Sequence, residues 1–422
     1  MNIITTTDDL EAFCERCSKS PYIAIDTEFM RETTYWPRLC LVQVATPEEA
    51  AIIDPMAEPA PDLAPLVALV QNPAVTKVFH AARQDIEIFV KLGGRVPEPL
   101  FDTQVAAMVC GFGEQIAYDQ LVLRVTGDRI DKSSRFTNWA NRPLSKAQLA
   151  YALADVTHLC EIYEYLSQAL AEQGRTDWVK EEMAVLTAAE TYSTRPQDAW
   201  QRLKLKARAP VEFAVLREIA ALREEEAQTR DVPRGRILKD DVIYEIATHR
   251  PDSQEALGRL RSFPQGLERS RLGQRVVAAV KAVLERPEES WPALPERRPS
   301  ADGASAAVEL MKVLLRLTAE RHGVAAKVIA TVDDLEALVA TPDAPQPVLT
   351  GWRRTVFGEQ ALQLLAGEVA LGFNGRRAVA ISLGEPIAKV SVARKPRRRR
   401  KPKAEGAASP PEAVATADGP AT

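Results

Sequence analysis

Two carboxylates, Asp26 and Glu28, come directly after the apolar residues 22–25. In a strand, residues two positions apart project from the same face, so this spacing predicts two neighbouring acids. Such acids raise each other's pKa unless a cation lies between them, and carboxylate oxygens suit Mg²⁺ or Mn²⁺. Because Asp-x-Glu is a common pattern, a strand that simply ends in a polar turn is the alternative interpretation.

A second candidate pair lies in a long helical pattern over about residues 145–173. Tyr151 and Asp155 are four residues apart and therefore share a face of the helix, which continues with the apolar Leu159, Ile162 and Leu166. A carboxylate at the head of an apolar line is costly without a partner. An ordinary aspartate on the helix surface is the alternative interpretation, and only the other acidic segments of the chain make a functional acid the favoured one.

A third acid, Asp85, falls in the first turn of a helix predicted over residues 83–92. The positive end of the helix dipole favours a carboxylate at this position. Acidic residues are also the commonest structural choice there, so Asp85 alone indicates little.

A scaffold has to bring these three segments together. Strands are predicted at residues 22–28, 39–46, 50–54 and 77–80. Helices are predicted at about residues 7–19, 62–71, 83–92, 102–110, 117–126 and 145–173. Strands followed by interleaved helices are typical of a mixed sheet covered by helices.

Composition limits the class of protein. The chain has 422 residues, of which 46% are hydrophobic and 27% charged, as expected of a globular protein with about three domains. We expect no signal peptide and no membrane span, because no apolar run approaches about 18 residues. Five scattered cysteines favour a reducing cytoplasm.

The charge distribution is uneven. Residues 394–403 carry eight positive charges, which leaves a net charge of −12 on the rest of the chain. The basic segment is predicted to be extended and disordered. It is interpreted either as an electrostatic tether for a polyanionic partner or as a solubility tail.

Beyond about residue 190 the composition changes. We predict a polar connector at 191–210, a helical domain at 211–286, a Pro-rich linker at 287–303, a second helical domain at 304–383 and a disordered tail at 384–422.

Taken in order, Asp26-x-Glu28, Asp85 and Tyr151-x-x-x-Asp155 resemble the three exonuclease motifs of the DEDD superfamily, in its DEDDy branch. Longer segments resemble bacterial ribonuclease D, namely DTEFMRETTYWPRLCLVQ (26–43), FDTQ (101–104), DKS (131–133), RPLSKAQLAY (142–151) and DAW (198–200). VPRGRIL (232–238) resembles an HRDC domain, which residues 304–383 loosely repeat. The resemblance implies an RNase H-like α/β exonuclease domain over residues 1–190, followed by two small all-α HRDC-type bundles.

The resemblance also implies a mechanism with two divalent ions, Mg²⁺ or Mn²⁺, roughly 3.5–4 Å apart. Asp26 would bridge both ions, and Glu28 and Asp155 would complete the ion that activates water. Asp85 would hold the ion on the leaving-group side. Tyr151 would orient the attacking water, because a phenol with an ordinary pKa of about 10 need not act as the base.

Five residues are expected near the substrate. Phe29, Met30 and Tyr35 are candidates to stack on or wedge the terminal bases, with core or loop packing as an equal alternative. Lys132 is a candidate phosphate contact, with a solvated surface lysine as an equal alternative. His80 is more often a structural histidine than a ligand.

We therefore expect a metal-dependent 3′→5′ exoribonuclease that releases 5′-mononucleotides and trims the 3′ ends of tRNA precursors and other structured RNAs. Its expected partner is RNA, with no membrane and no obligate protein partner. A DNA exonuclease would share every catalytic residue, and a non-catalytic RNA-binding scaffold is a further alternative. Binding alone, however, does not require four converging carboxylates.

Overall fold

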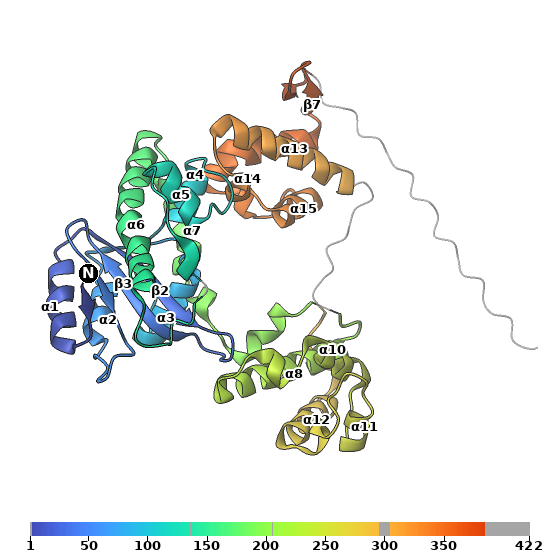
Figure 1. The fold of residues 1–422 in the computed structure, drawn as a ribbon. Coiled ribbons are helices and arrows are strands. Elements are labelled where there is room, and N and C mark those ends of the chain that lie inside the picture. The colour runs from blue at the N-terminus through green and yellow to red at the C-terminus, as the bar shows by residue number, and fades with distance from the viewer. Residues whose placement is uncertain (1, 136, 205, 295–303, 385–422) are drawn as a thin grey trace, which may run out of the picture.

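The computed structural model describes residues 2–135, 137–204, 206–294 and 304–384. An α/β unit, here the N-terminal unit, runs to residue 187 and is followed by a helical middle unit. A C-terminal unit then begins at residue 304 (Figure 1). The basic tail predicted at 384–422 lies outside the described residues, apart from residue 384.

A six-stranded mixed sheet forms the centre of the N-terminal unit. Its strand order is β1 (Ile3–Ile4), β4 (Ala50–Ile53), β3 (Arg38–Ala45), β2 (Tyr22–Met30), β5 (Thr76–Phe79) and β6 (Leu100–Asp102). Strand β2 runs antiparallel to β3 and parallel to β5. The predicted mixed sheet is confirmed, and the strand that carries Asp26 lies inside it.

Strand β2 is buried on both faces until it reaches its acids, as a near-continuous apolar run predicts. Ile23 and Ile25 contribute to the large core beneath α1 (Thr7–Cys17) and α2 (Ala64–Val70). Ala24 packs on the opposite face against Val156 and Leu159. Asp26 and Glu28 continue that second face.

A long helix, α6 (Lys146–Glu172), crosses the sheet over β2. Its first residue is fixed by a capping box, in which Ser145 and Gln148 each bind the other's backbone N–H. Helices α3 (Arg83–Gly93), α4 (Thr103–Val109) and α5 (Tyr118–Val125) agree with the predicted helical patterns. Helix α7 (Thr176–Thr187) was not predicted from the sequence.

The middle unit has a core of its own. Its helices are α8 (Pro210–Arg230), α9 (Arg234–Ile237), α10 (Asp240–His249), α11 (Gln254–Gly258) and α12 (Arg271–Leu284). Part of the predicted connector belongs to this core, because the 3₁₀ helix η3 (Pro196–Arg202) packs on α8 and buries Ala199 and Leu203.

The C-terminal unit contains α13 (Ala304–His322), α14 (Ala326–Ile329), α15 (Val332–Ala340), α16 (Gly351–Arg353), the π-helix η7 (Arg354–Gly358) and α17 (Glu359–Ala366). An antiparallel hairpin, β7 (Val369–Phe373) and β8 (Ala378–Ser382), ends it. The prediction that residues 304–383 are helical throughout was therefore wrong at this hairpin.

The C-terminal unit packs against α4 and α7 of the N-terminal unit, and their apolar residues form one continuous cluster (Figure 1). Trp178 and Trp352 stack with ring centroids 4.2 Å apart. The backbone N–H of Ala325 donates to the carbonyl oxygen of Met108 over 2.9 Å. None of the helices in the described part of the chain has the length and apolar character that a membrane span needs.

Candidate active site

Three carboxylates from two elements converge above the sheet. Asp26 and Glu28 come from β2 and Asp155 comes from α6, and one oxygen of each lies within 4.8 Å of the others. The alternation of β2 and the helical spacing of α6 produce this meeting, because both acids of the strand face the helix. Three converging carboxylate oxygens fit a divalent cation such as Mg²⁺ or Mn²⁺.

The electrostatics of the cluster also fit a bound cation. Burial, followed by the charge of Asp155, raises the pKa of Asp26 well above its ordinary value. Burial and the charges of Asp26, Asp155 and Asp85 raise the pKa of Glu28 to about 10. Burial raises the pKa of Asp155 to about 7, although Tyr151 and Arg135 counteract this shift. These acids therefore need positive charge to be ionised together at neutral pH.

Asp85 lies beside this group rather than within it. The hydroxyl of Thr27, between the two acids of β2, donates to Oδ1 of Asp85 over 2.5 Å. Burial, with the charge of Asp26, raises the pKa of Asp85 well above its ordinary value. The structure thus brings all four predicted acids to one region and holds Asp85 through a neighbouring side chain.

A strained turn leads into the helix that carries Asp85. Ala81, between β5 and α3, has a φ of 59°, a left-handed conformation that disfavours residues other than glycine. The buried carboxylate of Asp102 accepts the backbone N–H groups of Ala81 and Ala82 over 3.1 and 2.9 Å. It also caps α4 by accepting the N–H of Gln104 over 2.8 Å. Asp102 therefore fixes the turn that places Asp85.

Tyr151 lies next to Asp155, as the helical spacing predicts. Its hydroxyl donates to the Asp155 carboxylate and lowers the pKa of that acid. Burial, with the charge of Asp155, raises the pKa of Tyr151 further above its ordinary value. The phenol is therefore protonated at neutral pH and can donate or accept a hydrogen bond, but it cannot act as a base.

A cavity of about 420 Å³ opens beside the acids. Of the five expected substrate contacts, Phe29, His80 and Lys132 line it. The imidazole of His80 lies 3.0 Å from the Thr103 hydroxyl and 3.1 Å from the carbonyl oxygen of Ile116. Burial lowers its pKa, so His80 is neutral and held by the fold. Lys132 is paired at 2.5 Å with another lining residue, Asp119.

The other two expected contacts lie elsewhere. Met30 packs against a buried cluster that contains Leu41 and Trp139. Tyr35 is 2% exposed and belongs to the core of the middle unit. The stacking role expected for Tyr35 is therefore not supported, because its ring is covered by protein.

Several residues of the cavity were not identified from the sequence. The lining also includes Gln84, Gln104, Tyr118 and Arg135. The Tyr118 hydroxyl donates to the backbone oxygen of Asp155 over 2.6 Å and so supports the helix at this acid. Gln104 and Asp102 both belong to the FDTQ segment (101–104). The resemblance of that segment to ribonuclease D is the signal in the sequence that could have identified both residues.

Comparisons with known proteins agree with this site. A family model described as 3′-5′ exonuclease matches residues 1–171, and an HRDC domain model matches residues 212–280. Ribonuclease D of Nitrobacter hamburgensis is 52% identical over 381 residues, which cover 90% of this chain and 99% of the relative. Ribonuclease D of Granulibacter bethesdensis is 47% identical and covers 90% and 97%. This chain belongs to the ribonuclease D family.

A solved member of the ribonuclease D family has the same architecture. The crystal structure of Escherichia coli RNase D, described as an exoribonuclease involved in structured RNA processing, aligns with a TM-score of 0.77 and 30% sequence identity. The alignment covers 86% of this chain and 99% of that one. The predicted exonuclease fold, the HRDC domain and the 3′–5′ exoribonuclease activity are thereby confirmed. As a DEDD exonuclease, the chain depends on divalent metal, and its substrate is RNA.

Proposed function

We propose that this ribonuclease D-type enzyme releases 5′-mononucleotides from the 3′ ends of structured RNAs, with 3′-extended tRNA precursors among them. The convergence of Asp26, Glu28 and Asp155, with raised pKa values beside an open cavity, carries this proposal. Two divalent ions, Mg²⁺ or Mn²⁺, are the cofactors that these acids suit. We place the reaction in the cytoplasm, in keeping with the free thiols of all five cysteines.

Each catalytic side chain has a separate task. Asp26, Glu28 and Asp155 would hold one divalent ion, and Asp85, whose carboxylate accepts the hydroxyl of Thr27, would serve as a ligand of a second. Bound divalent ions neutralise phosphate charge and lower the pKa of the attacking water. The protonated hydroxyl of Tyr151 positions that water for attack in line with the departing ribose oxygen.

The cavity lining supports a terminal nucleotide beside the acids. Phe29 follows Glu28 directly in β2, where the strand register shifts between these two residues, and a bulge of this kind re-aims a side chain. Its ring offers a face on which a base can stack. Arg135 in the lining is a candidate to contact the phosphate backbone, as is Lys132 if phosphate displaces Asp119 from its ion pair.

The decisive experiment offers the purified protein a 3′-extended tRNA and a single-stranded DNA of matched sequence, with Mg²⁺, with Mn²⁺ and with EDTA. We expect stepwise loss of nucleotides from the RNA 3′ end, 5′-mononucleotide products and complete inhibition by EDTA. Asp26→Asn is the control for contaminating nuclease.

The same assay separates the alternatives. Equal or faster degradation of the DNA would indicate a DNA exonuclease. Tight RNA binding by the native protein without any product would indicate a non-catalytic scaffold. Stalling of the native enzyme near the terminal base pair of the acceptor stem, with the stem left intact, would agree with trimming of tRNA precursors.

A further inference from the structure

The loop between β2 and β3, residues 31–37 (the Tyr35 loop), leaves the catalytic strand directly after its acids. Its residues contact the middle unit, which contains the HRDC domain, on one side and helix α3 on the other. The Tyr35 loop therefore contacts both the middle unit and helix α3, and the positions of both matter for the reaction.

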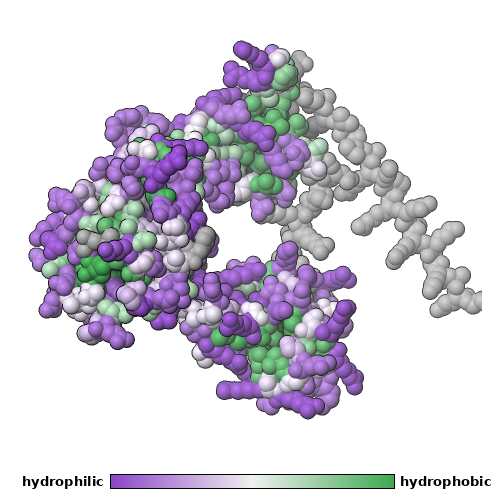
Figure 2. All heavy atoms as spheres, in the orientation of Figure 1, coloured by the Kyte–Doolittle hydropathy of each residue, from purple (hydrophilic) through white to green (hydrophobic). Residues whose placement is uncertain are grey.

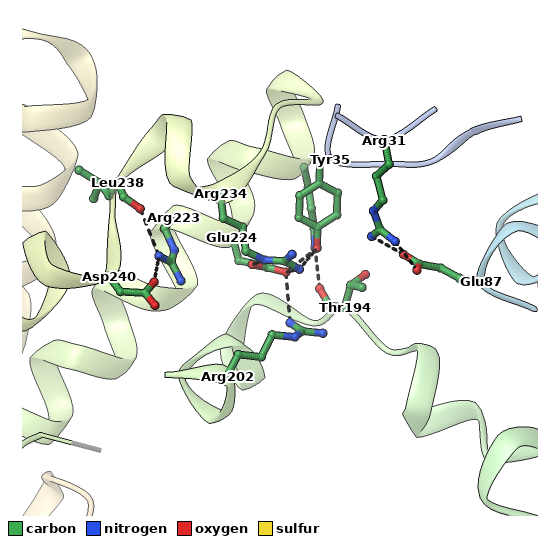
Figure 3. A network of polar contacts seen from close by, with 11 residues as sticks. Arg31, Tyr35, Glu87, Thr194, Arg202, Arg223, Glu224, Arg234, Leu238 and Asp240 are labelled. Carbon is green, nitrogen blue, oxygen red and sulfur yellow. Dashed lines mark hydrogen bonds and ion pairs between the residues drawn. The ribbon is translucent and has the colours of Figure 1, made fainter. Parts of the chain in front are cut away.

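On the HRDC side, Tyr35 enters a buried polar network (Figure 3). Its hydroxyl donates to the carboxylate of Glu224, which is fully buried in α8. The same hydroxyl accepts hydrogen bonds from Arg234 over 2.8 Å and from Gln228 over 3.1 Å. Arg234 also binds both oxygens of Glu224, over 2.5 and 2.6 Å.

This network keeps a charge inside the protein. Burial alone would raise the pKa of Glu224, but hydrogen bonds from Arg234 and Tyr35 lower it below its ordinary value. Arg234 also lies 4.6 Å from the centre of the Tyr35 ring. Since buried ion pairs demand good geometry, these contacts specify one orientation of the tyrosine.

A second anchor lies at the end of α8. The carboxylate of Asp231 accepts the backbone N–H groups of Tyr35 and Trp36 over 3.1 and 2.9 Å. Asp231 has a φ of 48° and ends the helix in the left-handed conformation. The HRDC domain thus holds both the side chain and the backbone of the loop.

On the catalytic side, the loop is tied to α3. Arg31 makes two hydrogen bonds with Glu87, over 2.7 and 2.8 Å (Figure 3). The ammonium group of Lys91 lies 4.8 Å from the centre of the Trp36 ring. Glu87 is two residues from Asp85, so the same loop connects the HRDC domain to the helix that carries this acid.

We propose that the Tyr35 loop is a coupling element that sets the orientation of the HRDC domain relative to the active site, with Tyr35 as a positioning residue for long, structured RNA. Exposed basic side chains of the HRDC domain, among them Arg236, Lys239, Arg259 and Arg261, are available to contact RNA phosphates. A long RNA with its 3′ end in the cavity benefits from these contacts only if the domain is held in place. A short RNA needs only the cavity.

The test rests on the proposed exoribonuclease function and uses full-length protein. Tyr35→Phe removes the hydroxyl but leaves Glu224 paired with Arg234, so the fold is kept. Combining it with Asp231→Gly removes the second anchor, and glycine suits the positive φ at that position. Tyr22→Phe is the matched control, because the hydroxyl of the buried Tyr22 donates to Glu164 over 2.8 Å within the exonuclease domain alone.

Activity is measured on an oligoribonucleotide of about five residues and on a 3′-extended tRNA. The double variant should raise KM for the tRNA at least about tenfold, because it loses hydrogen bonds to two charged groups, Glu224 and Asp231, and one such bond is worth about tenfold or more. Its kcat, and both constants for the short RNA, should stay within about twofold of the native values. Tyr22→Phe should leave the ratio between the two substrates unchanged.

A second measurement does not depend on activity. Small-angle X-ray scattering should show a larger radius of gyration for the double variant, because the HRDC domain is released, and the native radius for Tyr22→Phe. Equal losses on both RNAs, or an unchanged radius together with unchanged tRNA kinetics, would overturn the coupling. If the native enzyme degrades neither RNA, the proposed function fails, while the scattering still decides whether the loop fixes the domain.

Discussion

The acids of the active site work against the stability of the metal-free protein. A carboxyl whose pKa is higher in the folded chain than in the unfolded chain stabilises the fold at low pH and loses that contribution as the pH rises through its folded value. For Glu28 this window extends from its ordinary value of 4.5 to about 10. At neutral pH the folded protein therefore either retains protons or binds cations here.

We predict that Asp26→Asn abolishes turnover, because a neutral amide is a poorer ligand than a carboxylate for a divalent cation, yet raises the Tm of the metal-free protein. A gain of about 1 kcal/mol corresponds to about 2–4 °C in a domain of this size. The gain should be larger at pH 8 than at pH 5, where the native acids are largely protonated. Calorimetry in EDTA measures it. A lower Tm at pH 8, or near-normal hydrolysis, would contradict the assignment.

Tyr151→Phe should lower kcat by about 10²–10⁴-fold, the range for a group that positions a proton-transfer partner, with little change in KM for RNA. Because the hydroxyl lowers the pKa of Asp155, its loss should also move the acidic limb of the pH–rate profile to higher pH. Tyr165→Phe, at an exposed position, is the control. A loss expressed only in KM would make Tyr151 a substrate contact.

The positions of residues that follow from a local sequence pattern could be predicted, whereas those of residues whose partners lie far away in the sequence could not. Asp26, Glu28, Tyr151 and Asp155 occupy positions whose local periodicity already determines the face that they share. Tyr35 looks like a base-stacking aromatic in its own loop. Its partner Glu224 is 189 residues away, a separation at which no local pattern reports contact.

At the scale of elements, the turn between β5 and α3 determines where Asp85 lies. Its left-handed residue, Ala81, is held by hydrogen bonds to Asp102. Mutation of a group that orients a metal ligand commonly weakens metal affinity about 10–100-fold.

Asp102→Asn should therefore raise the Mg²⁺ concentration required for half-maximal activity about tenfold, because an amide cannot accept all of these N–H groups. Adding Ala81→Gly should restore part of the loss, since glycine adopts the turn without strain. Mg²⁺ titrations of activity and of Tm both report the change. The control is Asp62→Asn, because the exposed carboxylate of Asp62 accepts the N–H of Ala64 in the turn before α2. Unchanged Mg²⁺ dependence would show that the turn holds without Asp102.

Elements with strong periodicity were also the ones predicted best. Helix α6 has apolar residues along its whole length, and its observed bounds lie within one residue of the expected ones. The hairpin of β7 and β8 was missed although Asn374 and Gly375, a common pair in tight hairpins, mark its turn. Gly375 has a φ of 88° there, and Asn374 accepts the N–H of Arg377.

At the scale of the molecule, the chain has two large apolar cores, and they do not follow the order of the units along the sequence. The exonuclease domain and the C-terminal unit share one apolar cluster. The HRDC domain, which lies between them in sequence, has a second cluster that also includes Tyr35 of the exonuclease domain. In Figure 2 the HRDC domain is the lower mass, set apart from the C-terminal unit. The tryptophan stack of α7 and α16 belongs to the shared cluster.

Trp352→Ala should destabilise the exonuclease domain and the C-terminal unit together, by about 3–5 kcal/mol, the usual range for truncation of a buried tryptophan. Trp291→Ala, in contact with the HRDC core, should affect only the HRDC transition. Urea unfolding followed by hydrogen exchange separates the two. Protection lost in the C-terminal unit alone after Trp352→Ala would show that the shared cluster does not unfold as one body.

The shared cluster also has a consequence during synthesis. The whole exonuclease domain has been synthesised once α7 has left the ribosome. Its apolar surface at α4 and α7, however, stays uncovered until helices α13 to α17, which end at residue 366, have also been synthesised. At the usual speed of translation these further residues take roughly 10–35 s. Throughout that interval the nascent chain presents an apolar face with no cover, while the HRDC domain is already able to fold. Truncation before residue 304 makes this interval permanent, so such fragments should aggregate or be retained by chaperones.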